Sequence, residues 1–122
     1  MKTYEADEQE ALFQWAEVYA NIYPELQLMF HIPNGGSRNR LEAANLKRQG
    51  VKAGVPDILL PSPRGKYHGL FIELKVAKNK PTVNQINWLQ QLSKQGYAVC
   101  ICYSWTEARE KIIKYLEVKS EN

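Results

Sequence analysis

Two short segments of the sequence carry carboxylates in positions suited to binding a metal. Asp57 follows Pro56, and Glu73 comes sixteen residues later in Glu73-Leu74-Lys75; both segments are otherwise apolar, as strands often are. Carboxylates on adjacent strands can converge on a hard divalent cation such as Mg²⁺, which binds one or two carboxylates and keeps several waters. We therefore expect Asp57, Glu73 and the backbone carbonyl of Leu74 to form a metal site.

Lys75 adds a positive charge to this group. Side chains alternate along a strand, so Lys75 emerges on the same face as Glu73. An ammonium there could orient a water molecule or stabilise charge that develops on a phosphate, which suits phosphodiester hydrolysis. The structural alternatives are an exposed Glu-x-Lys charge pair and an Asp that opens a turn after proline. Burying Asp and Glu costs free energy unless a cation compensates them, so the apolar surroundings favour the metal site.

The elements that must position these residues alternate between helices and strands. The expected order is an acidic helix ended by Pro24, a strand within 26–32, a basic helix over 39–49, strands over 55–60 and 68–76, a helix opened by a capping box at 82–85, a strand over 97–103, and a helix opened by a second capping box at 104–107. A helical crossover between the strands at 68–76 and 97–103 makes that pair parallel. The pattern predicts an α/β fold.

The size of the chain fits one domain, residues 1–122, of about 100 to 150 residues. No apolar run approaches the roughly 20 residues that span a bilayer, and the start of the chain is acidic rather than a signal peptide, so we expect an intracellular protein. Cys100 and Cys102 are expected to be small buried hydrophobes, because neighbours two apart on a strand are poorly placed for a disulfide.

The net charge of +3 is distributed unevenly. Residues 1–30 carry −5, whereas residues 31–80 hold ten Lys or Arg against three Asp or Glu and carry +7. A localised positive region suits a phosphate-rich partner such as nucleic acid, and a solvated basic surface is the alternative.

Several segments in a fixed order resemble the VRR-NUC family of the PD-(D/E)xK nuclease superfamily, in particular its small members from phages and bacteria. Beside the superfamily signature at 56–57 and 73–75, the matching segments are 31–36, 46–51, 53–57 and 69–75, followed by Gln85; the resemblance runs from about Glu8 to Leu116. It implies a restriction-endonuclease-like core, with a mixed central sheet flanked by helices. It also implies Mg²⁺- or Mn²⁺-dependent cleavage of DNA by a homodimer similar to junction-resolving enzymes.

Carried over by position, the resemblance makes Asp57 and Glu73 metal ligands and Lys75 the catalytic lysine. Gln85 matches a glutamine that would hold a water or a phosphate near the metal; alternatively it is the capping-box glutamine of its helix, and one side chain cannot easily fill both roles. The superfamily usually adds an acid from the first helix. Glu8 is the candidate here, with Glu10 as a second choice, although these acids could merely complement the helix dipole.

A set of further residues is expected to contact DNA. Consecutive glycines let the backbone approach a phosphate and His or Asn side chains could hydrogen-bond it, although a tight turn is the plain alternative; basic residues would extend the contact along the DNA backbone without reading its sequence. The candidates are His31, Asn34, Gly35, Gly36, Arg38, Arg40, Lys47, Arg48 and Lys52.

Together these observations predict a metal-dependent DNA endonuclease that selects branched structures such as a Holliday junction. A flap or general nicking nuclease and a non-catalytic nucleic-acid-binding module are the alternatives. We expect it in the cytoplasm of a bacterial cell or of a phage-infected host, with no membrane partner.

Overall fold

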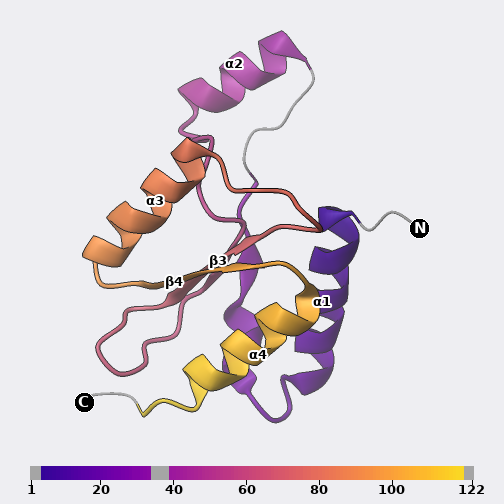
Figure 1. Cartoon of the computed structure of the whole chain (residues 1–122), viewed down its shortest axis with the longest axis vertical. Helices are drawn as coiled ribbons and strands as arrows, with labels where there is room; N and C mark the ends of the chain where they lie inside the picture. The colour runs from indigo at the N-terminus through magenta and orange to yellow at the C-terminus, as the bar shows by residue number, and fades with distance from the viewer. Residues whose placement is uncertain (1–3, 34–38, 120–122) are drawn as a thin grey trace.

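The computed structural model describes residues 4–33 and 39–119. They form a four-stranded sheet in the order β1-β2-β3-β4, with helices packed on both faces (Figure 1). The helical elements are α1 (Glu5–Tyr19), the 3₁₀ helix η1 (Pro24–Leu28), α2 (Arg40–Arg48), α3 (Val83–Lys94) and α4 (Trp105–Leu116). The strands are β1 (Phe30–His31), β2 (Ile58–Leu60), β3 (Leu70–Leu74) and β4 (Ala98–Cys102).

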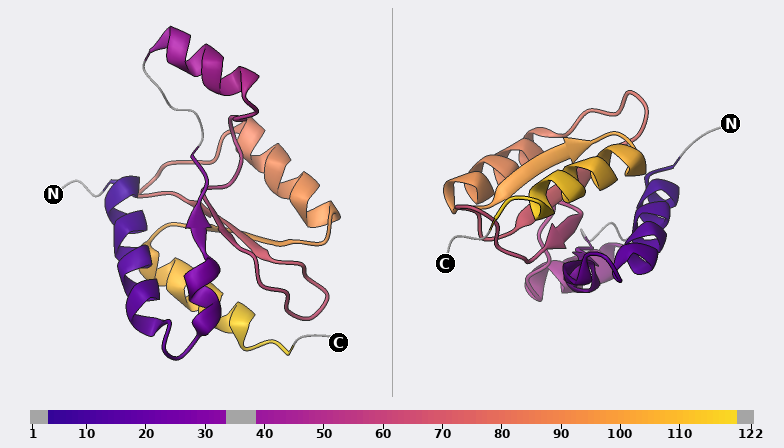
Figure 2. Two further views of the ribbon diagram at one scale, coloured as in Figure 1. Left: turned by 180° about the vertical axis from the view of Figure 1, so that it is seen from behind. Right: turned by 90° about the horizontal axis from the view of Figure 1, so that it is seen from below.

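The sheet is mixed, as the sequence predicted. β1 pairs antiparallel with β2, β2 pairs antiparallel with β3, and β3 pairs parallel with β4 through the α3 crossover. The view from behind in Figure 2 shows β1 at one edge of the sheet, and β4 forms the other edge. The predicted α/β fold class is therefore confirmed.

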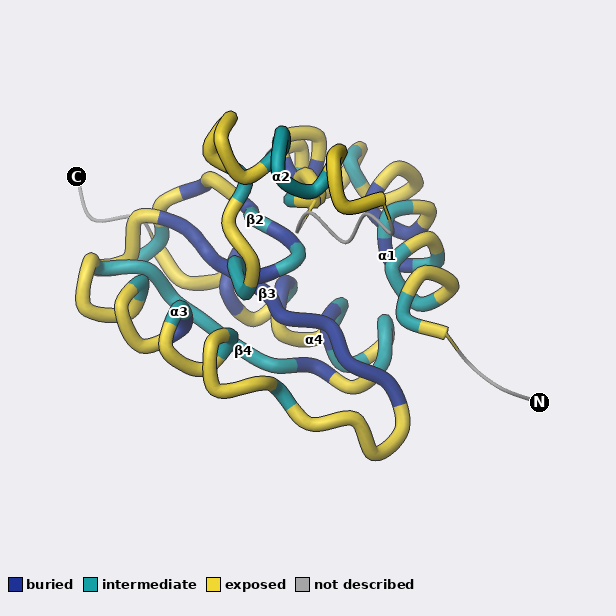
Figure 3. The backbone as a smooth tube through the Cα atoms, turned by 90° about the horizontal axis from the view of Figure 1, so that it is seen from above, coloured by how far each residue is buried: buried dark blue, intermediate teal, exposed yellow. Residues whose placement is uncertain are grey.

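The core lies between the sheet and the α1–α4 pair, while α3 covers the opposite face beside β4 (Figure 1). The alternating apolar residues of β3 supply its centre, since Ile72 is fully buried and Leu74 is 1% exposed. Figure 3 shows β3 as a continuous buried segment through the molecule. A strand buried on both faces holds its side chains rigidly, which suits a site built on Glu73 and Lys75.

Helix α2 differs from the other helices because none of its residues is buried, and it extends away from the sheet (Figures 1 and 2). Local signals fix its ends. Asn39 caps its start by accepting hydrogen bonds from the backbone N–H groups of Leu41 at 2.9 Å and Glu42 at 3.2 Å. Gly50 follows its end with a φ of +102°, a conformation that favours glycine. The basic helix predicted over 39–49 is confirmed.

Three sequence predictions need correction. The strand expected within 26–32 is present but covers only Phe30–His31, because the residues up to Leu28 belong to the 3₁₀ helix η1, which starts at a proline and packs Leu26 into the core. The second capping box is half formed: Ser104 accepts from the Glu107 backbone N–H, but the Glu107 carboxylate accepts from Tyr103 N–H instead. Helical spacing predicts four apolar residues on the inner side of α3, namely Ile86, Trp88, Leu89 and Leu92, but only Leu89 is buried.

The two cysteines are free, as expected, and Cys102 is fully buried. Their sulfur atoms lie 3.7 Å apart on one face of β4. Within the described residues, no helix is long and apolar enough to cross a membrane.

Candidate active site

Asp57 lies immediately before β2 and is held at both its side chain and its backbone. Its Oδ2 accepts a hydrogen bond from the backbone N–H of Leu74 at 2.8 Å. Its carbonyl oxygen accepts one from Ile32 N–H at 2.7 Å and one from His31 Nδ1 at 2.9 Å. Asp57 therefore connects β1 and β3, and the bond from Leu74 fixes its carboxylate beside the end of β3.

Glu73 is the buried acid of the site, with 1% of its surface exposed. Its Oε2 accepts a hydrogen bond from Gln85 Nε2 at 3.2 Å and lies 3.8 Å from Lys75 Nζ. Its Oε1 is buried and has no hydrogen-bond partner among the described residues. A buried oxygen without a donor costs free energy, so this atom is suited to a cation that completes the site.

The electrostatics of Glu73 agree with that geometry. Burial, followed by the negative charge of Asp57, raises the pKa of Glu73 from 4.5 to about 8, although the Lys75 ammonium acts in the opposite direction. Without a metal, the protein therefore stabilises the protonated form of Glu73 near neutral pH. A divalent cation reverses this preference, because its charge favours both carboxylates in the ionised form.

The carbonyl of Leu74 faces the same side of β3 as Asp57. Lys75 N–H bonds Cys102 O on β4, so the alternating backbone groups of Leu74 point to the other side, where Leu74 N–H meets Asp57. The carboxyl groups of Asp57 and Glu73 thus interact at this end of β3, beside the backbone of Leu74. Oxygen ligands of this kind fit Mg²⁺ or Mn²⁺, which need only one or two protein carboxylates. In the described part of the chain, no group of three or more His, Cys, Asp or Glu side chains could hold a metal.

Gln85 completes the capping box of α3 and also contacts the buried acid of the site. Its Oε1 accepts from the backbone N–H of Thr82 at 2.8 Å, which completes the capping box of α3, and its Nε2 donates to Glu73. The amide is bifunctional, with an acceptor at one atom and a donor at the other, and the reversed orientation would oppose two donors at Thr82. The capping-box alternative for Gln85 is therefore confirmed, and its second atom is used on Glu73.

The acids of α1 occupy two different places. The Oε1 atom of Glu8 accepts a hydrogen bond from the backbone N–H of Trp105 at 3.0 Å, so Glu8 holds the first turn of α4. Glu5, one turn earlier in α1, contributes negative charge that raises the pKa of Glu73. Glu5 was not a candidate from the sequence, because the acidic residues of a first turn look equivalent until tertiary contacts distinguish them.

The predicted DNA-contact residues that the structure describes are all exposed. His31 lies beside Asp57, and the others lie on α2 or just after it, namely Arg40, Lys47, Arg48 and Lys52. Asn34, Gly35, Gly36 and Arg38 lie outside the described residues. The exposed basic residues therefore include those of the extended helix α2, and His31 contacts the backbone of Asp57.

The loop that connects α2 to Asp57 includes the segment 53–57 and is tied to α3. The carbonyl of Ala53 accepts hydrogen bonds from Asn84 Nδ2 at 2.9 Å and Trp88 Nε1 at 3.1 Å, both on α3. Gly54 has a φ of +89°, and a Cβ there would lie 2.8 Å from the Asn84 side chain. Gly54 is the feature of the sequence that could have indicated this contact, since the backbone can approach a helix this closely only at a glycine.

Comparisons with known proteins agree with this geometry. A family model, the VRR-NUC domain, matches residues 4–105. A solved structure described as a VRR_NUC domain protein superimposes with a TM-score of 0.84 at 28% sequence identity, covering 100% of this chain and 96% of that one. No curated protein matches the chain.

A mixed sheet with paired carboxylates and a lysine at the end of its central strand defines a nuclease-type fold. The chain belongs to the VRR-NUC domain family.

Proposed function

We propose that this protein is a divalent-metal-dependent DNA endonuclease of the PD-(D/E)xK type, which hydrolyses phosphodiester bonds. The observation that carries the proposal is the state of Glu73: a fully buried carboxylate with one oxygen unpartnered in the described structure, a lysine 3.8 Å away and the charge of Asp57 beside it. Such an arrangement is costly for stability and is retained at sites that perform chemistry.

Asp57, Glu73 and the Leu74 carbonyl would hold Mg²⁺ or Mn²⁺. When bound, the cation supplies positive charge for the scissile phosphate and lowers the pKa of water. The protein's own contribution is to keep these oxygens in place before the substrate arrives: Leu74 N–H holds one carboxylate and Gln85 holds the other.

Lys75 is the proposed catalytic residue. Its side chain is only about one-tenth exposed and lies on the same face as Glu73. From there the ammonium donates hydrogen bonds to a phosphate oxygen or to the attacking water, which stabilises negative charge on the phosphate and orients the nucleophile. The ion pair with Glu73 limits the positions that Lys75 can adopt.

Binding of the DNA would depend on the exposed basic residues. His31 and the cations of α2 and the loop after it would contact phosphates without reading bases. One chain offers one such site, so two symmetric cuts in a branched substrate need a second copy related by a two-fold axis. We therefore propose a homodimer that acts on four-way junctions, in the cytoplasm.

The test is cleavage of a labelled four-way junction, a flap and a matched linear duplex by one preparation, with Mg²⁺, Mn²⁺ or EDTA. Paired cuts in the junction that need the metal and disappear in Asp57→Ala support the proposal. Faster cutting of the flap would identify a flap nuclease instead of a junction-cleaving enzyme. Single nicks in every substrate would identify a general nicking nuclease. Tight binding without cutting in either metal would identify a nucleic-acid-binding module and reject catalysis.

A further inference from the structure

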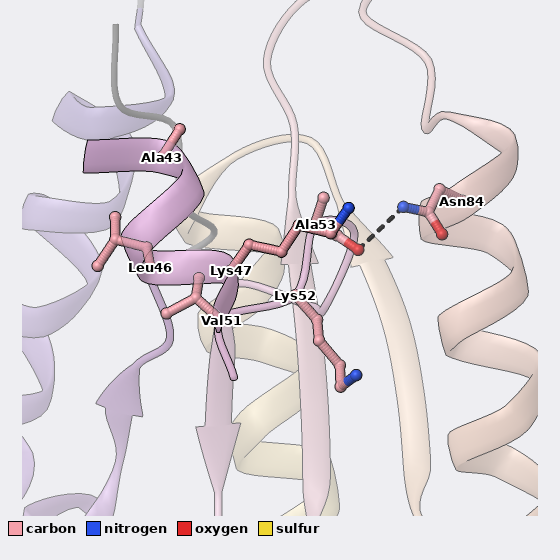
Figure 4. A pocket seen from close by; sticks show the side chains of 7 residues that line it. All are labelled: Ala43, Leu46, Lys47, Val51, Lys52, Ala53 and Asn84. Carbon is pink, nitrogen blue, oxygen red and sulfur yellow. Dashed lines mark hydrogen bonds between the residues drawn. The ribbon is translucent and has the colours of Figure 1, made fainter. Parts of the chain in front are cut away.

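A cavity of about 430 Å³ opens between α2 and the start of α3 (Figure 4). Ala43 and Leu46 of α2, with Val51 of the following loop, form an apolar wall. Lys47 and Lys52 line the same cavity, and neither makes an ion pair within residues 4–33 and 39–119. The volume is in the range of cavities that bind small organic molecules, and the lining joins an apolar surface to two free cations.

This combination suits a nucleotide unit. The base would lie against the apolar wall while the lysines neutralise its phosphate. A lipid tail or an apolar peptide would leave both ammonium groups without a partner. The charge of the lining therefore favours a polyanion that carries flat apolar groups, which is single-stranded nucleic acid.

Asn84 supplies a polar contact on the α3 side of the cavity. Its Nδ2 donates to the Ala53 carbonyl, so its Oδ1 remains an acceptor to which no described residue donates. Adenine, cytosine and guanine carry exocyclic amino groups that can donate to such an oxygen, and an unpaired thymine can donate its ring N3–H, so the contact is open to every base.

The cavity is also fixed relative to the proposed catalytic residues. Asn84 directly precedes Gln85, whose amide holds Glu73, and consecutive Cα atoms lie about 3.8 Å apart. On the other wall, Ala53 lies four residues before Asp57 and is tied to α3 by its two hydrogen bonds. A nucleotide in this cavity would therefore neighbour a phosphate bound at the carboxylates.

We propose that this cavity binds an unpaired base next to the scissile phosphate and thereby selects DNA with unpaired nucleotides over intact duplex. The inference rests on the proposed nuclease function. A base within a duplex must unstack and unpair before it can enter the cavity, whereas a base in a bulge or a single-stranded flap is already unpaired. The cavity would thus give structure selectivity without reading the sequence.

The test uses duplexes with a single bulged 2-aminopurine, whose fluorescence reports unstacking, or with the same base paired. Binding is measured with Lys75→Met, so that the DNA stays intact. Added to this background, Ala43→Phe fills the cavity, while Ala44→Phe places the same bulk one residue further along α2, away from the lining. We expect binding to change the fluorescence of the bulged base only, and Ala43→Phe to abolish that change and weaken binding of the bulged duplex about tenfold or more. Ala44→Phe should do neither.

An unchanged fluorescence signal on binding, or equal behaviour of the two phenylalanine variants, overturns the proposal. If Ala43→Phe lowers the melting temperature of the protein, the smaller substitution Ala43→Leu takes its place in the comparison with Ala44→Phe. Cleavage by the wild-type protein with Mg²⁺ is scored separately. Cutting without a fluorescence response rejects only the cavity, whereas a response without cutting rejects the nuclease proposal and leaves a base-binding cavity.

Discussion

Nε2 of Gln85 donates a hydrogen bond to Oε2 of Glu73 at 3.2 Å, while Oε1 of the same amide caps the start of α3. The end of a helix and the buried acid of the sheet are thus fixed by one side chain. Because the two contacts use different atoms, their effects on stability and on activity can be separated.

Gln85→Glu keeps an acceptor for the Thr82 N–H and removes the donor to Glu73, whereas Gln85→Ala removes both. We expect Gln85→Ala to lower the free energy of unfolding by about 1 kcal/mol, the usual cost of a lost cap. Both variants should lose cleavage activity, because Gln85→Ala removes the hydrogen bond that holds Glu73 and Gln85→Glu places a third carboxylate beside it. Chemical denaturation and cleavage rates on the same preparations check this; a fully active Gln85→Glu would refute the role of the donor.

Glu73 should make the metal-free protein less stable as the pH rises. Its pKa is about 8 in the folded chain and 4.5 ordinarily, so between these values the folded state holds a proton that the unfolded state has released. The stability contributed by protonated Glu73 is complete below about pH 4.5 and is lost as the pH rises through about 8.

Glu73→Gln should therefore be more stable than the wild type at pH 9 by about 2 kcal/mol, and close to it at pH 5. Adding Mg²⁺ should raise the melting temperature of the wild type and leave that of the variant unchanged. Thermal denaturation across this pH range, with Glu110→Gln as an exposed control, measures the difference. Equal pH profiles would contradict the burial of an uncompensated acid.

His31 should act through the backbone of Asp57. The amide nitrogen of asparagine can replace Nδ1, which donates to the Asp57 carbonyl, whereas glutamine places its nitrogen nearer the position of Nε2. We expect His31→Asn to keep most of kcat and His31→Gln to lose about tenfold, the value of one hydrogen bond. Separate measurement of kcat and KM decides: a loss confined to KM in both variants would show a role in DNA binding alone.

The two acids of α1, Glu8 and Glu5, should affect different properties: Glu8 the stability of the fold and Glu5 the affinity for the metal. Glu8→Ala should lower the free energy of unfolding by about 1 kcal/mol by freeing Trp105 N–H, with little effect on metal affinity. Glu5→Gln should leave stability nearly unchanged and weaken Mn²⁺ binding a few-fold, since its charge acts on Glu73. Calorimetric titration with Mn²⁺ measures the metal affinity of both variants. A strong loss of Mn²⁺ affinity in Glu8→Ala alone would restore Glu8 as the metal-site acid.

Elements with strong local signals were predictable from the sequence. Asn39 and Thr82 cap their helices as their residue types suggest, and Gly50 and Gly96 follow the ends of α2 and α3 with positive φ. The parallel pairing of β3 and β4 follows from the helix between them.

Strand boundaries and the details of the site depended on tertiary contacts. β2 starts at Ile58 rather than at residue 55, because the Asp57 side chain takes the Leu74 N–H that a longer strand would have paired. The shared face of Glu73 and Lys75 follows from alternation alone. The contacts of Gln85 and the charge of Glu5 involve residues distant in the chain, and no periodicity of one segment encodes them.

The most direct test of the account compares Mg²⁺-dependent cleavage of a four-way junction by the wild type, Lys75→Met and Lys78→Met. Lys75 is buried beside Glu73, while Lys78 is an exposed lysine just beyond the same strand. We expect Lys75→Met to lower kcat about a hundredfold or more while junction binding is retained. Lys78→Met should cleave at a rate near that of the wild type. Equal cleavage by both variants would contradict a catalytic role for the Asp57, Glu73 and Lys75 cluster.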